Sequence, residues 1–289
     1  MDRLAWLRDR QTLVGATDIT RLLGVAPASW GGAFRVWRDK IEAPGANTED
    51  EDWSYWGRAL EPLIAQRYGE LLGVEVKAWA DGHSPIARSA SHQYVGASPD
   101  WYVVGKTASE DRVIECKTVS AFMADEWGPS GSAQIPLHYQ RQVQWQLGCL
   151  QHPAAIIAAL IGGNAFRWYP VLADDEWFQH SASFADSWYE NHVVNNAPPI
   201  PDRRSDIVVG APAENGLILT ADDDLGELID ERKVWKLRER EAAEHLKKLD
   251  AHFVYALGTQ YDQINGRDGK VEVTYRAGKN GKRRLVIKV

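Results

Sequence analysis

The segment that most constrains the fold is VIECKTV, residues 113–119. Its apolar residues are typical of a β-strand, in which side chains two positions apart share a face. Glu115 and Lys117 are therefore expected side by side, with Ile114 and Cys116 on the opposite face. Taken alone, the alternation fits an edge strand whose wet face carries a solvated ion pair. The rest of the chain decides between this reading and a functional one.

Helical and strand-like patterns alternate around this segment. Helices are predicted at 33–40, 54–73, 136–151 and 174–195, and as two helices separated by a turn at Gly15 within 3–25. Strand-like runs occupy 74–118, including YVGASPDWYVVG at 94–105, and continue at 154–163 and 165–172. This order predicts a mixed α/β core.

Two helix boundaries follow from single residues. Thr17 or Asp18 is well placed to cap the helix that follows Gly15. Pro62 is unfavourable inside the 54–73 segment, because proline lacks the N–H that a helix needs. That helix is therefore predicted to start or to kink at Pro62.

The proline-rich, polar segment 195–205 predicts a boundary between a main domain, 1–200, and an extension, 201–289. The extension is predicted to hold a charged helix over about 222–257 and a β-hairpin that turns near Asn280-Gly281. Apolar residues recur on this helix every seven positions, at Leu228, Trp235, Ala242, Leu249 and Ala256. With the basic cluster Lys282-Arg283-Arg284, this spacing indicates docking of a partner, a second subunit or DNA. A helix packed on its own core is the alternative.

Composition excludes several protein classes. Cys116 and Cys149 are the two cysteines and have no CxxC spacing, which argues against a zinc site, an iron–sulfur cluster and a disulfide scaffold. No apolar run is long enough to span a membrane and no signal peptide is recognised, so we expect a cytoplasmic protein. The net charge of −7 opposes nucleic-acid binding only if local patches are ignored.

Polar residues near the apolar segments form an ordered set. Glu61 borders the apolar stripe of the 54–73 helix, Asp100 follows Ser-Pro in GASPDW, and Gln142 lies beside Val143. Singly, each fits a solvated surface residue or a turn. Followed by Glu-x-Lys, the acids form the arrangement of a nuclease in which carboxylates converge on Mg²⁺. The metal polarises the scissile phosphate and activates water.

Five motifs in order, WLRDRQTLVGATD, WGRALE, GASPDW, IECK and YQRQVQW, carry a family resemblance. Over residues 5–160 the chain resembles the YqaJ-type viral recombinase family. These proteins are relatives of phage lambda exonuclease within the PD-(D/E)xK nucleases. The resemblance implies a restriction-endonuclease-like core, with a central mixed β-sheet flanked by helices. The extension with its long helix and hairpin lies beyond it.

The resemblance also implies a catalytic centre. The metal ligands would be Asp100, Glu115 and the backbone carbonyl of Cys116. Glu61 would serve the metal directly or through water. Lys117 would be the catalytic lysine, holding the attacking water or offsetting transition-state charge. It would act as a base only if burial strongly depressed its pKa.

A second group of residues is implied at the DNA end. Gln142 would position the nucleophile or the DNA end. Arg10, Thr17 and Ser98 would bind the 5′-phosphate of the digested strand, because a guanidinium and hydroxyl groups are good phosphate donors. Thr17 stands where the family usually has serine. Arg8 replaces Arg10 if the helix register differs by half a turn.

The implied activity is a Mg²⁺-dependent 5′-to-3′ exonuclease that accepts Mn²⁺ as a substitute. It would act on linear double-stranded DNA ends and leave 3′ single-stranded tails for phage-type recombination by annealing. The expected partners are DNA ends, a single-strand annealing protein and further copies of the chain, since related exonucleases form trimers; no membrane is involved. The alternatives are an endonuclease, a RecB-like nuclease of other polarity, and a non-catalytic scaffold that binds DNA ends.

Overall fold

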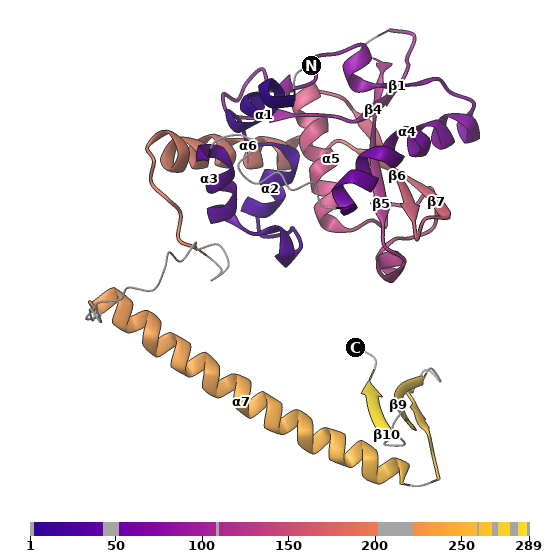
Figure 1. Ribbon diagram of the computed structural model, residues 1–289, viewed down its shortest axis with the longest axis vertical. Helices are drawn as coiled ribbons and strands as arrows, with labels where there is room; N and C mark the ends of the chain where they lie inside the picture. The colour runs from indigo at the N-terminus through magenta and orange to yellow at the C-terminus, as the bar shows by residue number, and fades with distance from the viewer. Residues whose placement is uncertain are drawn as a thin grey trace. The chain divides into compact units, whose positions relative to one another are not determined.

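Residues 112–119 form the middle strand of a five-stranded sheet in the computed structural model (Figure 1). The strand order is β1-β4-β5-β6-β7; β5 and β6 are parallel, and the other pairs are antiparallel. The strands are β1 (Val76–Ala78), β4 (Trp101–Val103), β5 (Arg112–Val119), β6 (Ala154–Ile161) and β7 (Ala165–Leu172). Because β5 lies inside the sheet, the edge-strand reading of VIECKTV is wrong.

The structure describes residues 3–42, 52–107, 110–201, 222–258, 260–267, 271–277 and 283–287. The chain divides into two units, Met1–Gly210 and Ala211–Val289. The five-stranded sheet belongs to the first unit.

One helix covers each face of the sheet. The α4 helix (Asp52–Leu72) packs Ile64 against Ile114 and Cys116 of β5. The α5 helix (Leu137–Leu150) packs Val143 against the opposite face, which includes Val113. Period-two alternation in β5 thus supplies apolar side chains to both layers. Each large apolar side chain that is fully buried stabilises the fold by about 1.5–3 kcal/mol.

The α4 helix runs through Pro62 and begins at Asp52, so the prediction that it starts at Pro62 is wrong. Favourable packing of the helix on the sheet outweighs the single lost backbone hydrogen bond. The predicted strand over 94–105 is also wrong in part. It is interrupted after β3 (Gly96–Ala97) and resumes at β4, because Pro99 has no N–H for a ladder.

A helical layer packs against the outer side of α5. It contains α1 (Arg3–Gln11), α2 (Ala16–Leu22), α3 (Ala33–Ile41) and α6 (Asp175–Tyr189), with a π-helical turn over Glu190–Val194. Its core includes Ile19, Val36, Trp145 and Phe178. β2 (Ala87–Arg88) pairs with β3 as a small separate sheet.

The second unit contains the predicted long helix and hairpin. The helix is α7 (Asp223–Leu257), and β9 (Val271–Ala277) pairs with β10 (Arg283–Ile287). A further strand that was not predicted, β8 (Gln263–Asn265), pairs with β9. Leu228, Trp235 and Leu249 of the seven-residue stripe are exposed. Asn280, Gly281 and Lys282 lie outside the described residues, as do the side chains of Arg283 and Arg284.

Among the described residues, no helix combines the length and apolar character needed to cross a bilayer.

The contact between α5 and α6 depends on Gly148. A methyl group at this position would overlap the ring of Phe178. We expect Gly148→Ala to lower the free energy of unfolding by about 1–3 kcal/mol through overpacking. Gly57→Ala is the matched helical control, because the nearest atom to its Cβ would be Thr118 Oγ1 at 3.9 Å. Urea unfolding followed by tryptophan fluorescence measures both, and unchanged stability of Gly148→Ala would contradict this packing.

Candidate active site

A cavity of about 250 Å³ gathers every residue that the sequence predicted for the site. Its lining includes the catalytic and metal candidates together with the phosphate-binding candidates: Glu61, Asp100, Glu115, Cys116, Lys117, Gln142, Arg10, Thr17 and Ser98. They come from α1, α2, α4, β5, α5 and the segment between β3 and β4. Residues more than 100 positions apart are thereby brought to one place.

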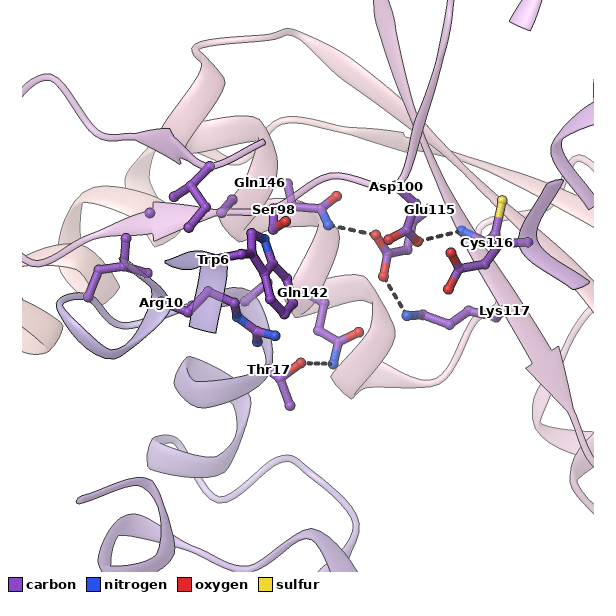
Figure 2. A pocket seen from close by; sticks show the side chains of 17 residues that line it. Trp6, Arg10, Thr17, Ser98, Asp100, Glu115, Cys116, Lys117, Gln142 and Gln146 are labelled. Carbon is purple, nitrogen blue, oxygen red and sulfur yellow. Dashed lines mark hydrogen bonds and ion pairs between the residues drawn. The ribbon is translucent and has the colours of Figure 1, made fainter. Parts of the chain in front are cut away.

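Glu115 is the centre of this group. It is buried on the α5 side of β5, where Lys117 pairs with its Oε1. Gln146 of α5 donates from Nε2 to Glu115 Oε2 at 2.6 Å. Figure 2 shows Lys117 and Gln146 directed at this carboxylate. A buried carboxylate is tolerated when it is paired and hydrogen-bonded in this way.

Glu115 interacts electrostatically with two further carboxylates. Asp100 Oδ2 accepts a hydrogen bond from the backbone N–H of Cys116 at 3.2 Å. Burial, followed by the charge of Glu115, raises the pKa of Asp100 well above its usual value. The same two causes raise the pKa of Glu61 to about 7. The site therefore holds three acids, and their negative charge is not fully balanced by the neighbouring positive charge.

Lys117 remains an ammonium group in this arrangement. Burial lowers its pKa, but Glu115 and Asp100 more than offset burial and raise it above the usual value. Its Nζ also lies 5.2 Å from the centre of the Tyr139 ring, a cation–π contact. The condition under which Lys117 acts as a base, a strongly depressed pKa, is not met here. A fixed positive charge is the role that this geometry supports.

The donor set fits a hard divalent cation. Asp100, Glu115 and Glu61 offer carboxylate oxygens, which Mg²⁺ prefers, and the raised pKa values of Asp100 and Glu61 indicate that these two groups would gain from a cation. Among the described residues, no three His, Cys, Asp or Glu side chains form a complete metal cluster by themselves. Mg²⁺ commonly takes one or two carboxylates and completes its shell with water and substrate phosphate.

Cys116 can contribute only its backbone. Its side chain is buried among Ile64 and Ile114 on the α4 face. Burial, with the nearby acids Asp100 and Glu115, raises the pKa of the thiol well above its usual value. A neutral, buried thiol is a poor ligand for Mg²⁺, which takes oxygen. The buried position of the Cys116 side chain is compatible with the expectation that its backbone carbonyl is the metal ligand.

The other end of the cavity is formed by the helical layer. The guanidinium of Arg10 lies over the ring of Trp6, 4.6 Å from its centre. Arg10, and not the exposed Arg8, lines the cavity, which favours Arg10 over the half-turn alternative. Ser98 Oγ donates to the carbonyl of Pro85 at 2.9 Å.

Gln142 joins the two ends of the site. It is buried in α5, and its Nε2 donates to Thr17 Oγ1 at 3.4 Å. Thr17 accepts this bond and keeps its own hydroxyl hydrogen for another acceptor. Figure 2 shows Gln142 between Thr17 and the carboxylates. A ligand that bound either at Thr17 or at the carboxylates would therefore contact Gln142.

The sequence interpretation missed Gln146. This residue is only 2% exposed, lines the cavity and orients Glu115. Its Oε1 has no hydrogen-bond partner among the described residues. Gln142 and Gln146 are four positions apart, a spacing that places both on one helix face. That spacing was the available signal.

A buried ion pair supports the phosphate end. Asp18 Oδ2 accepts from Lys40 Nζ at 2.6 Å and from the N–H of Gly15 at 2.9 Å. Lys40 also donates to the carbonyl of Arg10 at 3.2 Å. Gly15 precedes α2 as its cap, so the expected capping by Thr17 or Asp18 is wrong in position. Asp18 instead bonds back to Gly15 from the third helical residue, in the manner of a capping box.

This pair generates a stability prediction. Burial would raise the pKa of Asp18, but Lys40, Arg10 and Arg21 offset burial and lower it below its usual 3.8. Asp18→Asn would leave a buried ammonium unpaired, so we expect a loss of about 3–5 kcal/mol at neutral pH.

The pH dependence gives the sign of this effect. A lowered carboxyl pKa adds stability above pH 3.8 and loses it as the pH falls through the folded-state value. The difference between wild type and Asp18→Asn should therefore shrink in acid. Chemical denaturation at several pH values measures it. The double variant Asp18→Asn, Lys40→Met should recover part of the loss, and equal stability of the single variant and wild type would contradict the pairing.

Comparisons with known proteins agree with this fold. The structure is similar to that of LHK-Exo in complex with dAMP, with a TM-score of 0.51 and 17% identity over 66% of this chain and 93% of that one. It is also similar to the structure of the alkaline exonuclease LHK-Exo from Laribacter hongkongensis, with a TM-score of 0.50, 16% identity and the same coverage. The likeness confirms the predicted fold class, an α/β core whose central mixed sheet is flanked by helices.

Sequence comparison gives the family. The chain is 30% identical over 207 residues to the uncharacterized protein YqaJ of Bacillus subtilis (strain 168), which covers 71% of this chain. It spans about six-tenths of that relative's length, 61%. The model of the YqaJ-like viral recombinase domain matches residues 5–152. The chain therefore belongs to the YqaJ-like viral recombinase family.

Proposed function

We propose that this protein is a Mg²⁺-dependent exonuclease that digests the 5′-ended strand of linear duplex DNA. The observation that carries the proposal is the single cavity in which an acidic centre and a phosphate-binding group meet. Family membership and the PD-(D/E)xK fold support a nuclease in viral-type recombination. Mn²⁺ is expected to substitute for Mg²⁺.

The chain's own residues divide the chemistry among them. Asp100, Glu115 and the carbonyl of Cys116 would hold the cation, with Glu61 acting directly or through water. When bound, the cation would polarise the phosphodiester and lower the pKa of a water molecule. Lys117 places a positive charge where the phosphorus-bound oxygens gain negative charge in the transition state. Fixed charges of this kind act without reorganisation in a water-poor site.

The polarity of digestion follows from the opposite end of the cavity. Arg10 offers a planar set of donors to a terminal phosphate, and Thr17 retains a hydroxyl donor. Ser98 already donates to Pro85, so it would have to rotate to bind phosphate. A terminal 5′-phosphate held here would place the next phosphodiester near Glu115 and Lys117. The products would be 3′ single-stranded tails, the substrate of a single-strand annealing protein.

Cleavage of end-labelled DNA tests this function. The protein is incubated with Mg²⁺ and linear duplexes that carry either a 5′-phosphate or a 5′-hydroxyl, with a covalently closed circle alongside. We expect loss of the 5′-phosphorylated strand, slower loss of the 5′-hydroxyl strand and an intact circle. Lys117→Ala and Glu115→Ala should each reduce the rate by about 10²-fold or more, because each removes charge at the reacting phosphate.

Other outcomes would identify the alternatives. A cut circle would indicate an endonuclease, and loss of the 3′-ended strand a nuclease of other polarity. DNA ends that are bound but not cleaved in Mg²⁺ or Mn²⁺ would indicate a scaffold. Full activity in Lys117→Ala would contradict the assignment of the catalytic centre.

Gln146 allows the proposed cation site to be tested without catalysis. We expect Gln146→Met to weaken Mn²⁺ binding by about 10-fold, because outer-shell partners orient the metal-binding carboxylates. Gln144→Met is the matched control. Gln144 lies on the same helix and is equally buried, but it bonds to the carbonyl of Leu172 and the N–H of Asp174.

Titration calorimetry with Mn²⁺ in the absence of DNA provides the measurement. The control variant should lose stability and keep its Mn²⁺ affinity. An equal loss of affinity in both variants would show a general packing effect. Unchanged affinity in Gln146→Met would remove this residue from the site.

A further inference from the structure

We infer that a second cavity, on the far side of the acidic centre, binds the phosphodiester backbone of the strand that remains after the cut. This inference rests on the proposed function. The cavity is about 950 Å³, nearly four times the volume of the first, and shares Thr17, Glu61, Lys117 and Gln142 with it. The shared residues run from Thr17, at the phosphate end, through Gln142 to Glu61 and Lys117 beside the reacting phosphate, so one strand can occupy both cavities in sequence.

Arg21 is the first observation that points to an anionic ligand. It lines the second cavity and is only 8% exposed. Its Nη1 pairs with Asp39 at 2.9 Å, whereas its Nε has no acceptor among the described residues. A buried donor without an acceptor is costly, especially on a charged group. A phosphate oxygen would supply the acceptor that the protein does not.

The local charge is the second observation. Among the residues that the structure describes, the cavity is lined by four cations, Arg21, Arg35, Arg58 and Lys117, and by two acids, Asp39 and Glu61, a difference of +2. The whole chain carries −7. A concave, positively charged region on an acidic protein attracts and orients a polyanion.

The backbone at Gly31, in the short loop that follows the 3-10 turn Ala28–Trp30, lies close to two of these cations. Gly31 has a positive φ of +80°. A Cβ on Gly31 would lie 2.8 Å from Arg35 Cβ and 3.4 Å from Arg21 Nη2. Glycine therefore lets the loop backbone pass close to both arginines, while Ser29 and Ser54 add hydroxyl groups to the lining.

The two cavities together define a path for the strand. The small cavity with Arg10 accommodates the terminal 5′-phosphate and its nucleotide. The scissile phosphate lies at Glu115 and Lys117. The following phosphates continue past Arg58, which lies one helical turn before Glu61 on α4, toward Arg35. Arg58 is oriented by its bond to Ser54 Oγ at 2.7 Å, and a guanidinium has further donors for phosphate.

The salt dependence of DNA binding tests this path. The full chain is titrated with a 5′-phosphorylated linear duplex in EDTA, so that no strand is cut, at a series of KCl concentrations. We expect Arg35→Ala and Arg58→Ala each to reduce the slope of log affinity against log salt by about 1, because each removes one phosphate contact. Arg67→Ala should keep the wild-type slope. Arg67 lies on the same helix as Arg58, pairs with Glu70 at 3.3 Å and lines neither cavity.

A 5′-mononucleotide serves as the second probe. It is short enough to occupy only the small cavity, so its affinity should be unchanged in Arg35→Ala and Arg58→Ala. Arg21→Lys keeps the charge and removes Nε, so we expect a wild-type salt slope and about tenfold weaker duplex binding.

The outcomes separate this inference from the proposed function. Unchanged slopes in Arg35→Ala and Arg58→Ala, or an equal change in Arg67→Ala, would overturn the path, even if the wild type digests DNA ends. Wild-type duplex affinity in Arg21→Lys would likewise overturn the role of Nε. Reduced slopes in a protein that cleaves no DNA would support the path and refute the nuclease.

Discussion

The buried charge pair in β5 is the interaction on which the site depends. A carboxylate in the middle strand of a sheet is destabilising unless its charge is compensated and its oxygens are bonded. Lys117 supplies the charge from the same strand, and Gln146 supplies a hydrogen bond from the covering helix. The sheet can therefore hold Glu115 in its interior, where water is scarce and electrostatic interactions are strong.

Lys117 does not balance the negative charge of the acids that neighbour Glu115. One ammonium faces three carboxylates, and burial together with the charge of Glu115 raises the pKa values of Asp100 and Glu61. A protein that needed only stability would place apolar residues here, since such replacements are commonly neutral or favourable. The excess of negative charge is consistent with a divalent cation as the missing component.

Local rules predicted a large part of this site. The pairing of Glu115 with Lys117 follows from the period of a strand, which does not depend on tertiary context. The position of β5 within the sheet could not be predicted, because alternation is the same at an edge and in the middle. Pro62 does not mark the start of α4, since packing of the helix on the sheet overrides a local propensity. The role of Gln146 could not be predicted, because it depends on which face of α5 meets β5.

Whole-chain charge was the weakest guide, and the second cavity shows why. The net charge of −7 averages an acidic surface with a concave region of opposite sign. Asp39 illustrates the balance, because it pairs with both Arg21 and Arg35 and fixes their positions. One carboxylate is shared by two guanidinium groups, so Asp39 orients both arginines and balances the charge of only one of them. Preorganised cations of this kind would bind phosphate with little further loss of side-chain entropy, and an acid that fixes them is therefore compatible with the inferred site for a polyanion.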